Sequence, residues 1–172
     1  MRKIHLIYIL LVIFPVYLKG QHPIKTGENK VGNNIFVAKK ENSKLMSVSE
    51  RNSIIETYQK NRKSLQVLPF VEFADGKTIN LVFKDVLGVK RIKELVPEKR
   101  LLLEVYLNGQ GKVTAVHFLL NPNTYLTVDE IAQLNSAIKK GISIVIPAKV
   151  DKSKLFAPFF QNVQFEKLLA SD

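Results

Sequence analysis

The alternation of hydrophobic and polar positions is most regular between residues 101 and 120. Residues 101–107 and 113–120 are two runs rich in aliphatic and aromatic side chains, and the turn sequence Asn-Gly-Gln-Gly at residues 108–111 separates them. Such runs on either side of a glycine-containing connection are typical of a β-hairpin, because glycine adopts positive φ angles without steric cost. We therefore predict two antiparallel strands joined by residues 108–111.

A hairpin with this loop pairs Val105 with Thr114, which sorts the side chains onto two faces. One face is apolar and consists of Leu101, Leu103, Val105, Leu107, Val116, Phe118 and Leu120. The opposite face carries Leu102, Glu104, Tyr106, Ala115 and His117. In this register Glu104 and His117 are diagonal neighbours on one face, close enough for a hydrogen bond.

A helix with start and stop signals follows the hairpin. Thr127 and Glu130 form a Thr-x-x-Glu capping box, in which each side chain satisfies a free backbone N–H of the first turn. Apolar residues then recur with helical spacing at Val128, Ile131, Leu134 and Ile138. Gly141 is placed to end a helix over residues 128–140. The β-branched run at residues 142–146 predicts a further strand, which Pro147 closes.

The chain before residue 64 is less regular. Residues 21–46 contain two glycines, several asparagines and five lysines, with one short apolar run at residues 35–37, and we predict a flexible lead. Ser47 and Glu50 form a second capping box, which predicts a helix over residues 47–63. Its buried face is expected to consist of Ile54, Ile55 and Tyr58.

Three weaker patterns complete the predicted fold. Residues 67–73 and 78–83 flank an Asp-Gly pair and predict a second hairpin, residues 85–95 predict a short helix, and residues 162–167 predict a closing strand. The fold class is α+β: an antiparallel sheet of two hairpins plus closing strands, with the helix at 128–140 packed on one face and an additional N-terminal helix. Residues 47–172 are expected to form a single domain.

The first 20 residues have the outline of a secretory signal peptide. Arg2 and Lys3 precede an apolar run over residues 4–18, and Gly20 is a small residue at which a signal peptidase would cut. The run is shorter than the roughly 20 residues of a membrane-spanning helix. We therefore expect export to the periplasm or the cell surface after removal of residues 1–20, with a retained anchor as the alternative.

The chain offers little material for catalysis or metal binding. It contains no cysteine, and His117 is the only histidine of the predicted domain. Glu104 and His117 are the candidate catalytic pair, because a carboxylate that orients an imidazole makes a general base. The alternative is two polar residues on a partly solvated face. No catalytic or phosphate-binding motif is present, so we expect no enzymatic activity, no cofactor and no metal.

The chain is basic, with a net charge of +11, and removal of residues 1–20 leaves +8. Lys90, Arg91 and Lys93 lie in a segment rich in cations, which predicts contact with an anionic polymer or with lipid headgroups. The alternative is a solvated helix face. No aromatic residue lies among these cations to stack on bases, so nucleic acid is not an expected partner. Membrane contact is expected only if the leader is retained.

A family resemblance covers residues 96–167. Pro97 and Glu98 precede a strand, a turn ending in Gly-Lys-Val follows at residues 111–113, and Asp129-Glu130 begins a helix. In these features the segment resembles the C-terminal domain of TonB-type energy transducers, which implies a sheet edge that accepts a partner's strand. Residues 21–46 contain one proline in place of that family's long proline-rich spacer, so energy transfer to an outer-membrane receptor is not expected.

These observations favour an exported, non-catalytic module that binds a protein partner in the cell envelope. If the closing strand is a sheet edge, its backbone around Val163 and Phe165 is available to a partner's strand. Phe159 and Phe160 either pack in the core or form an exposed apolar patch for a partner beside it. The alternatives are an enzyme with a carboxylate-based site and a protein that binds an anionic polymer or lipid surface.

Overall fold

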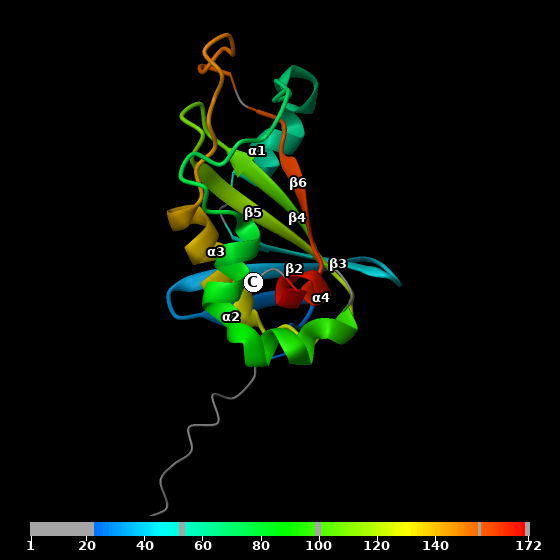
Figure 1. The fold of residues 1–172 in the computed structure, drawn as a ribbon. Coiled ribbons are helices and arrows are strands. Elements are labelled where there is room, and N and C mark those ends of the chain that lie inside the picture. The colour runs from blue at the N-terminus through cyan, green and yellow to red at the C-terminus, as the bar shows by residue number, and fades with distance from the viewer. Residues whose placement is uncertain (1–22, 52–53, 99–100, 155, 171–172) are drawn as a thin grey trace, which may run out of the picture.

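Residues 23–51, 54–98, 101–154 and 156–170 are described in a computed structural model. They form a six-stranded antiparallel sheet in the order β1-β2-β3-β5-β4-β6 with helices packed on it, which confirms the predicted α+β class (Figure 1). The strands are β1 (Gly27–Val31), β2 (Asn34–Asn42), β3 (Leu45–Glu50), β4 (Leu101–Leu107), β5 (Val113–Leu120) and β6 (Phe159–Val163). The helices are α1 (Ile55–Lys60), α2 (Ile79–Leu95), α3 (Val128–Gly141) and α4 (Phe165–Ala170), with short 3₁₀ helices η1 (Arg62–Ser64) and η2 (Val96–Glu98).

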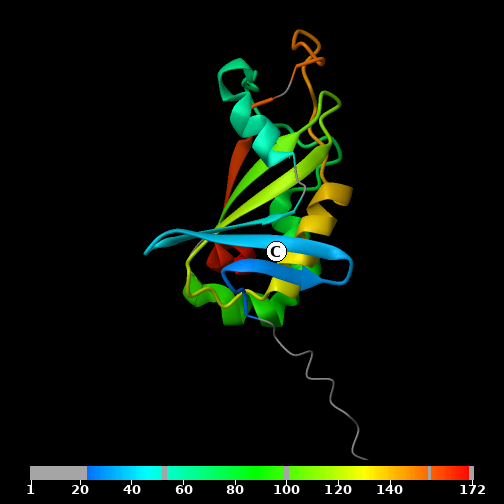
Figure 2. The same cartoon turned by 180° about the vertical axis from the view of Figure 1, so that it is seen from behind.

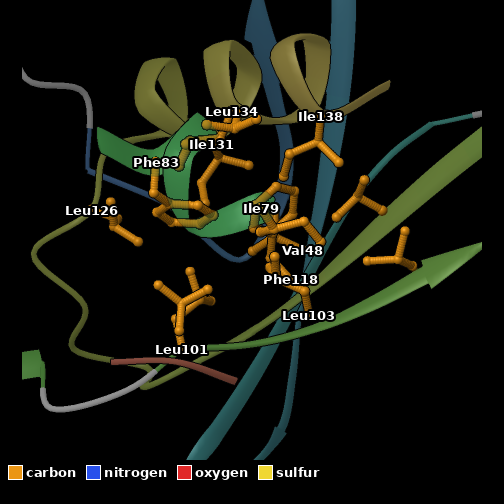
Figure 3. Packing of buried hydrophobic residues seen from close by; sticks show 14 of the residues in the cluster. Val48, Ile79, Phe83, Leu101, Leu103, Phe118, Leu126, Ile131, Leu134 and Ile138 are labelled. Atoms are coloured by element: carbon orange, nitrogen blue, oxygen red, sulfur yellow. The ribbon is translucent and has the colours of Figure 1, made fainter. Parts of the chain in front are cut away.

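The helices cover the two faces of the sheet unequally. α2, α3 and α4 lie over one face, whereas α1 lies on the opposite face near one end of the sheet (Figures 1 and 2). The main core lies between the sheet and the three helices, where buried residues of both layers meet, among them Val48, Leu103, Phe118, Ile79, Phe83 and Leu134 (Figure 3). Each such side chain contributes about 1.5–3 kcal/mol of burial free energy.

The predicted hairpin is β4 and β5, and its two faces are those expected from the sequence. The pairing, however, differs by two residues, because Val105 lies opposite Val116 rather than Thr114. A bulge between Tyr106 and Leu107 changes the register next to the turn. Glu104 and His117 are therefore direct cross-strand partners, not diagonal ones.

The capped helix is also confirmed, as α3. The Thr127 hydroxyl accepts a hydrogen bond from the Glu130 backbone N–H at 3.2 Å, and the Glu130 carboxylate accepts one from the Thr127 N–H at 2.8 Å. The predicted apolar stripe is buried at all four positions. Sequence signals suffice here because the cap and the stripe favour the same helix.

The expectation of a flexible lead over residues 21–46 is wrong for the described part of that segment. It forms β1, β2 and the start of β3, and Phe36 and Ala38 of β2 are buried in the main core. Gly32, with φ of 57°, and Asn33 make a two-residue turn between β1 and β2. The segment contributes few core residues, and its many asparagines and lysines are the composition of a flexible lead.

The predicted helix over residues 47–63 is wrong in its first part. Ser47 and Glu50 belong to β3, and the helical part begins at Ile55 as α1. Ile54, expected on the buried face, is exposed, whereas Ile55 and Tyr58 are buried. Residues 45–50 place alternate side chains in the core, which is the two-residue period of a strand and overrides the capping pattern.

The predicted second hairpin at residues 67–83 is wrong as well. Residues 79–83 begin α2, which continues through the predicted helix at 85–95, and the Thr78 side chain caps it by accepting from the Leu81 N–H at 3.3 Å. Its aliphatic and aromatic residues suit a strand by composition, but burial against α3 and α4 favours a helix. Gly88, with φ of 71°, produces a kink within α2.

Two further strand predictions need correction near the C-terminus. Residues 142–146 form no continuous strand, because Ser143 and Ile144 make only isolated bridges, to Lys112 and Phe73. The closing strand is β6, which begins earlier than the predicted residues 162–167 and ends before α4. Phe165 is therefore a helical residue, fully buried 6.3 Å from the ring of Phe83.

Gly111 fixes the hairpin turn against the segment after α3. It has φ of 75°, and a Cβ atom there would lie 2.0 Å from the backbone oxygen of Ile144. We predict that Gly111→Ala lowers the free energy of unfolding by about 1–2 kcal/mol for the left-handed backbone and about 1–3 kcal/mol more for the clash. Urea unfolding measures the loss in each variant. Gly76→Ala is the control, because Gly76 has φ of 64° and open space around it, and it therefore measures the backbone term alone. The additional loss in Gly111→Ala is the clash term. Equal losses in the two variants would contradict this account of the turn.

Candidate functional site

A row of side chains crosses the sheet on the face opposite the main core. Ser49 of β3 lies opposite His117 of β5, His117 lies opposite Glu104 of β4, and Glu104 lies opposite Phe160 of β6. Direct cross-strand partners share a face with their Cβ atoms about 4.5–5.5 Å apart. The β4–β5 hairpin and two strands from distant parts of the sequence, β3 and β6, thus bring one hydroxyl, one imidazole, one carboxylate and one aromatic ring together.

The predicted pair of Glu104 and His117 is a hydrogen-bonded dyad in the structure. Nδ1 of His117 lies 2.8 Å from Oε2 of Glu104, and the Tyr106 hydroxyl donates to the same oxygen at 3.0 Å. The side chains of His117 and Glu104 are 15% and 21% exposed. An ionised carboxylate only accepts hydrogen bonds, so both neighbours serve as donors and Nδ1 carries a proton.

α1 supports one side of the dyad through an aromatic contact. The rings of Tyr58 and Tyr106 meet edge to face, with centroids 4.9 Å apart and planes at 69°. Burial raises the pKa of Tyr58, which keeps its hydroxyl protonated, and the hydroxyl donates to the backbone oxygen of Leu107. Tyr106 therefore has little freedom to turn away from Glu104.

Two pockets flank the dyad on this face, one on each side of it. The first, of about 340 Å³, is polar and carries both signs of charge. It is lined by His117, Ser47, Ser49, Gln59, the cations Lys39 and Arg51, the acids Glu41, Glu50 and Glu56, and the apolar Val37 and Ile55. The second, of about 310 Å³, lies between α1 and the start of β6 and is lined by Glu104, Tyr106, Tyr58, Leu65, Pro158 and Phe160. Both volumes fall within or near the range of small-ligand sites.

β6 is the end strand of the described sheet, and it pairs with β4 on one side. Of the four residues predicted for binding, Phe159 and Phe160 lie at the start of this strand and Val163 at its end. Phe160 is 60% exposed and Phe159 half-buried, whereas Val163 is fully buried in the core. Phe165 lies in α4, outside the edge. The exposed part of the predicted surface is thus limited to Phe160 and the outer backbone of β6.

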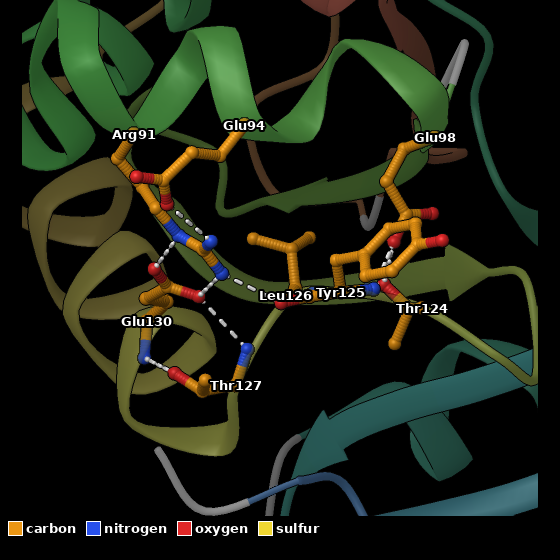
Figure 4. Close-up of polar contacts among 8 residues, drawn as sticks. All are labelled: Arg91, Glu94, Glu98, Thr124, Tyr125, Leu126, Thr127 and Glu130. Atoms are coloured by element: carbon orange, nitrogen blue, oxygen red, sulfur yellow. Dashed lines mark hydrogen bonds and ion pairs between the residues drawn. The ribbon is translucent and has the colours of Figure 1, made fainter. Parts of the chain in front are cut away.

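The three cations predicted to bind an anionic surface have different roles. Lys90 and Lys93 are exposed on α2, but Arg91 is committed to an internal ion pair (Figure 4). Its Nε lies 2.6 Å from Oε1 of Glu130, and its other nitrogens donate to Glu94 at 2.9 Å and to the Tyr125 carbonyl at 2.6 Å. The Glu130 hydrogen bond raises the pKa of Arg91. Arg91 is therefore a tie between α2 and α3, and the prediction of an anion-binding role for it is wrong.

Within the described residues, no cluster of histidine, aspartate and glutamate side chains has the arrangement of a metal site. The same residues contain no helix that is both long and apolar enough to cross a membrane. The predicted signal peptide, residues 1–20, lies outside the described part of the chain.

Ser49 is the residue of this site that the sequence analysis missed. It was assigned to a helix, and in a helix it has no fixed relation to His117. In residues 46–49, the apolar Met46 and Val48 alternate with two serines. This alternation is typical of a strand whose serines face away from the core, and it was the available signal for Ser49.

The Arg91 ion pair gives a direct stability test. We predict that Arg91→Gln lowers the free energy of unfolding by about 1.5–3 kcal/mol, because hydrogen bonds to a charged group are lost and the Glu130 carboxylate loses its partner. Lys93→Gln, two positions away on the exposed face of α2, should change it by less than about 0.5 kcal/mol. Thermal or urea unfolding measures both, and equal effects would show that Arg91 does not tie the helices.

The sequence matches no protein-family model, and no match was found among curated proteins. Among solved structures, the chain is similar to a DUF5043 family protein from Bacteroides uniformis ATCC 8492, known from a crystal structure at 1.85 Å resolution. The TM-score is 0.58 at 12% sequence identity, and the match covers 81% of this chain and 84% of that chain. At this identity the similarity supports the fold alone, and the α+β architecture is the conclusion that the comparison carries.

Proposed function

We propose that this protein is an exported binding module that pairs β6 with an extended segment of a partner protein in the cell envelope. The observation that carries the proposal is the position of β6 at the end of the described sheet, with Phe160 exposed beside it. An end strand directs alternate N–H and C=O groups away from the sheet, where a partner's strand can bind them. Among the described residues, β4 is the one strand that pairs with β6.

The composition of the two end strands supports β6 as the binding edge. Proteins protect sheet edges from strand addition with charged residues, prolines and bulges. β1, at the other end, carries Glu28 and Lys30, both exposed. β6 has the sequence Phe-Phe-Gln-Asn-Val, without a charge, a proline or a bulge in its pairing with β4. The chain therefore protects one edge and leaves the other suited to a partner.

The pocket beside β6 indicates what kind of partner segment would fit. Phe160, Pro158 and Tyr106 give the second pocket an apolar lining next to the start of the strand. A strand added to β6 projects every second side chain toward this face. We infer that the partner segment is extended and carries an apolar side chain that enters this pocket.

Export rests on the predicted signal peptide at residues 1–20. The resemblance to TonB-type C-terminal domains remains a prediction; residues 101–163 contain two strands, a helix and a third strand in the order that it implies. Of the three cations predicted for an anion-binding role, Lys90 and Lys93 remain, because Arg91 is paired with Glu130. The binding edge is therefore the better supported function.

The edge can be blocked without disturbing the core. We predict that Phe160→Glu combined with Asn162→Lys reduces partner capture from the envelope fraction at least tenfold, because both exposed positions then place charges at the docking edge. The measurement is a pull-down with residues 21–172 at low and high salt, and the captured partner should survive high salt.

Val89→Lys is the matched control, because Val89 is a 55% exposed apolar residue on α2. It should leave capture unchanged. Capture that is insensitive to the β6 variant, or that falls equally in the control, would contradict binding at β6. Partners lost at high salt from every variant would instead support an anionic-surface function.

A further inference from the structure

We propose that Ser49, His117 and Glu104 form a nucleophile, general base and orienting carboxylate for acyl transfer from small esters. This activity goes beyond the proposed binding function and does not depend on β6. It also departs from the expectation that the protein has no enzymatic activity. The proposal rests on the cross-strand row that aligns these three residues on the open face of the sheet.

The hydrogen bonds of Glu104 determine which nitrogen of His117 is basic. Nδ1 donates to the Glu104 carboxylate at 2.8 Å, so the neutral imidazole carries its free lone pair on Nε2. Tyr106 donates to the same carboxylate oxygen and helps to keep it in place. A carboxylate that holds the imidazole in this tautomer is the arrangement of hydrolytic triads on unrelated folds.

Ser49 lies on the side of His117 away from Glu104. β3 and β4 flank β5, so the direct partners of His117 are Ser49 on one side and Glu104 on the other. Within the described residues, the Ser49 hydroxyl has no hydrogen-bond partner, whereas the Ser47 hydroxyl donates to Glu41 at 2.6 Å. Among the described residues the Ser49 hydroxyl is bonded to no group, His117 included, so the proposal requires these two cross-strand partners to close on each other when a substrate binds.

The pocket in front of these residues indicates the substrate class. Its volume of about 340 Å³ suits a small acyl group, and Val37 and Ile55 give it apolar surface. Lys39 and Arg51 line the same pocket, as do Glu41, Glu50 and Glu56, and we assign Lys39 as the cation that faces a developing oxyanion. These features fit a short-chain ester better than a polymer, which would need a longer groove.

The reaction balances without a cofactor. Ser49 Oγ bonds to the ester carbonyl carbon as Nε2 of His117 takes the hydroxyl proton, and the carbon–oxygen bond to the leaving alcohol breaks as that alcohol receives the proton. Water then attacks the acyl-serine, with His117 again accepting its proton. The products are a carboxylic acid and an alcohol, and the serine is restored.

A fluorophosphonate reagent tests the nucleophile directly, since it forms a phosphorus–oxygen bond to an activated serine and releases fluoride. We expect the adduct to map to Ser49 by peptide mass spectrometry. Ser49→Ala should abolish it, and Glu104→Gln or His117→Gln should slow it about a hundredfold or more, the usual contribution of a general base. Ser47→Ala is the matched control and should label at the original rate. Circular dichroism checks that each variant is folded.

Ser49→Cys provides a second readout, because the chain has no other cysteine. An imidazole beside a thiol favours the thiolate, so iodoacetamide should alkylate Ser49→Cys faster than Ser49→Cys combined with His117→Gln, in which the cysteine has the same position on β3. Three results would overturn the proposal. They are the absence of an adduct at Ser49, an adduct that forms at the same rate without His117 or Glu104, and equal alkylation of the two cysteine variants.

Discussion

The pairing of β4 with β5 in one register is the constraint on which the rest of the structure depends. These two strands lie side by side inside the sheet, and their alternation sends Leu103, Val105, Val116 and Phe118 into the core under α2, α3 and α4. A slip of one residue would bury Glu104 and His117 there and cost several kcal/mol in lost hydration. The turn supports this register, since Gly111 packs directly against the backbone of Ile144.

The same alternation explains what the sequence could and could not predict. The two faces of the hairpin depend on whether a position is odd or even, so the prediction of the faces survived a register error of two residues. The bulge accounts for one of these residues and a shorter turn for the other. α3 was predictable because its capping box and its apolar stripe are local. α2 was not, since Ile79 and Phe83 suit a strand by propensity, and only their burial against α3 and α4 makes them helical. The hairpin in the lead was missed because it places few residues in the core.

The candidate site follows from the strand order, which no local pattern reveals. Glu104 and His117 could be paired from the sequence because they lie on adjacent strands of one hairpin. Ser49 and Phe160 reach the same row through β3 and β6, which are far away in the chain and whose order in the sheet depends on the whole fold. One sheet face thus combines a partly buried polar dyad, a pocket on each side of it and an end strand suited to a partner. The proposed binding uses Phe160 and the outer backbone of β6. The proposed chemistry uses the side chains of Ser49, His117 and Glu104 in the same cross-strand row.

The central structural claim is that β4 and β5 are interior strands and that β6 is an edge. Amide hydrogen exchange of residues 21–172, resolved residue by residue by NMR, tests it directly. The account predicts slow exchange along both β4 and β5, and in β6 an alternation of slow amides bonded to β4 with fast amides that face solvent. Uniformly slow exchange across residues 159–163 in the free protein would show that another segment already covers the edge, and fast exchange along β4 would contradict the strand order itself.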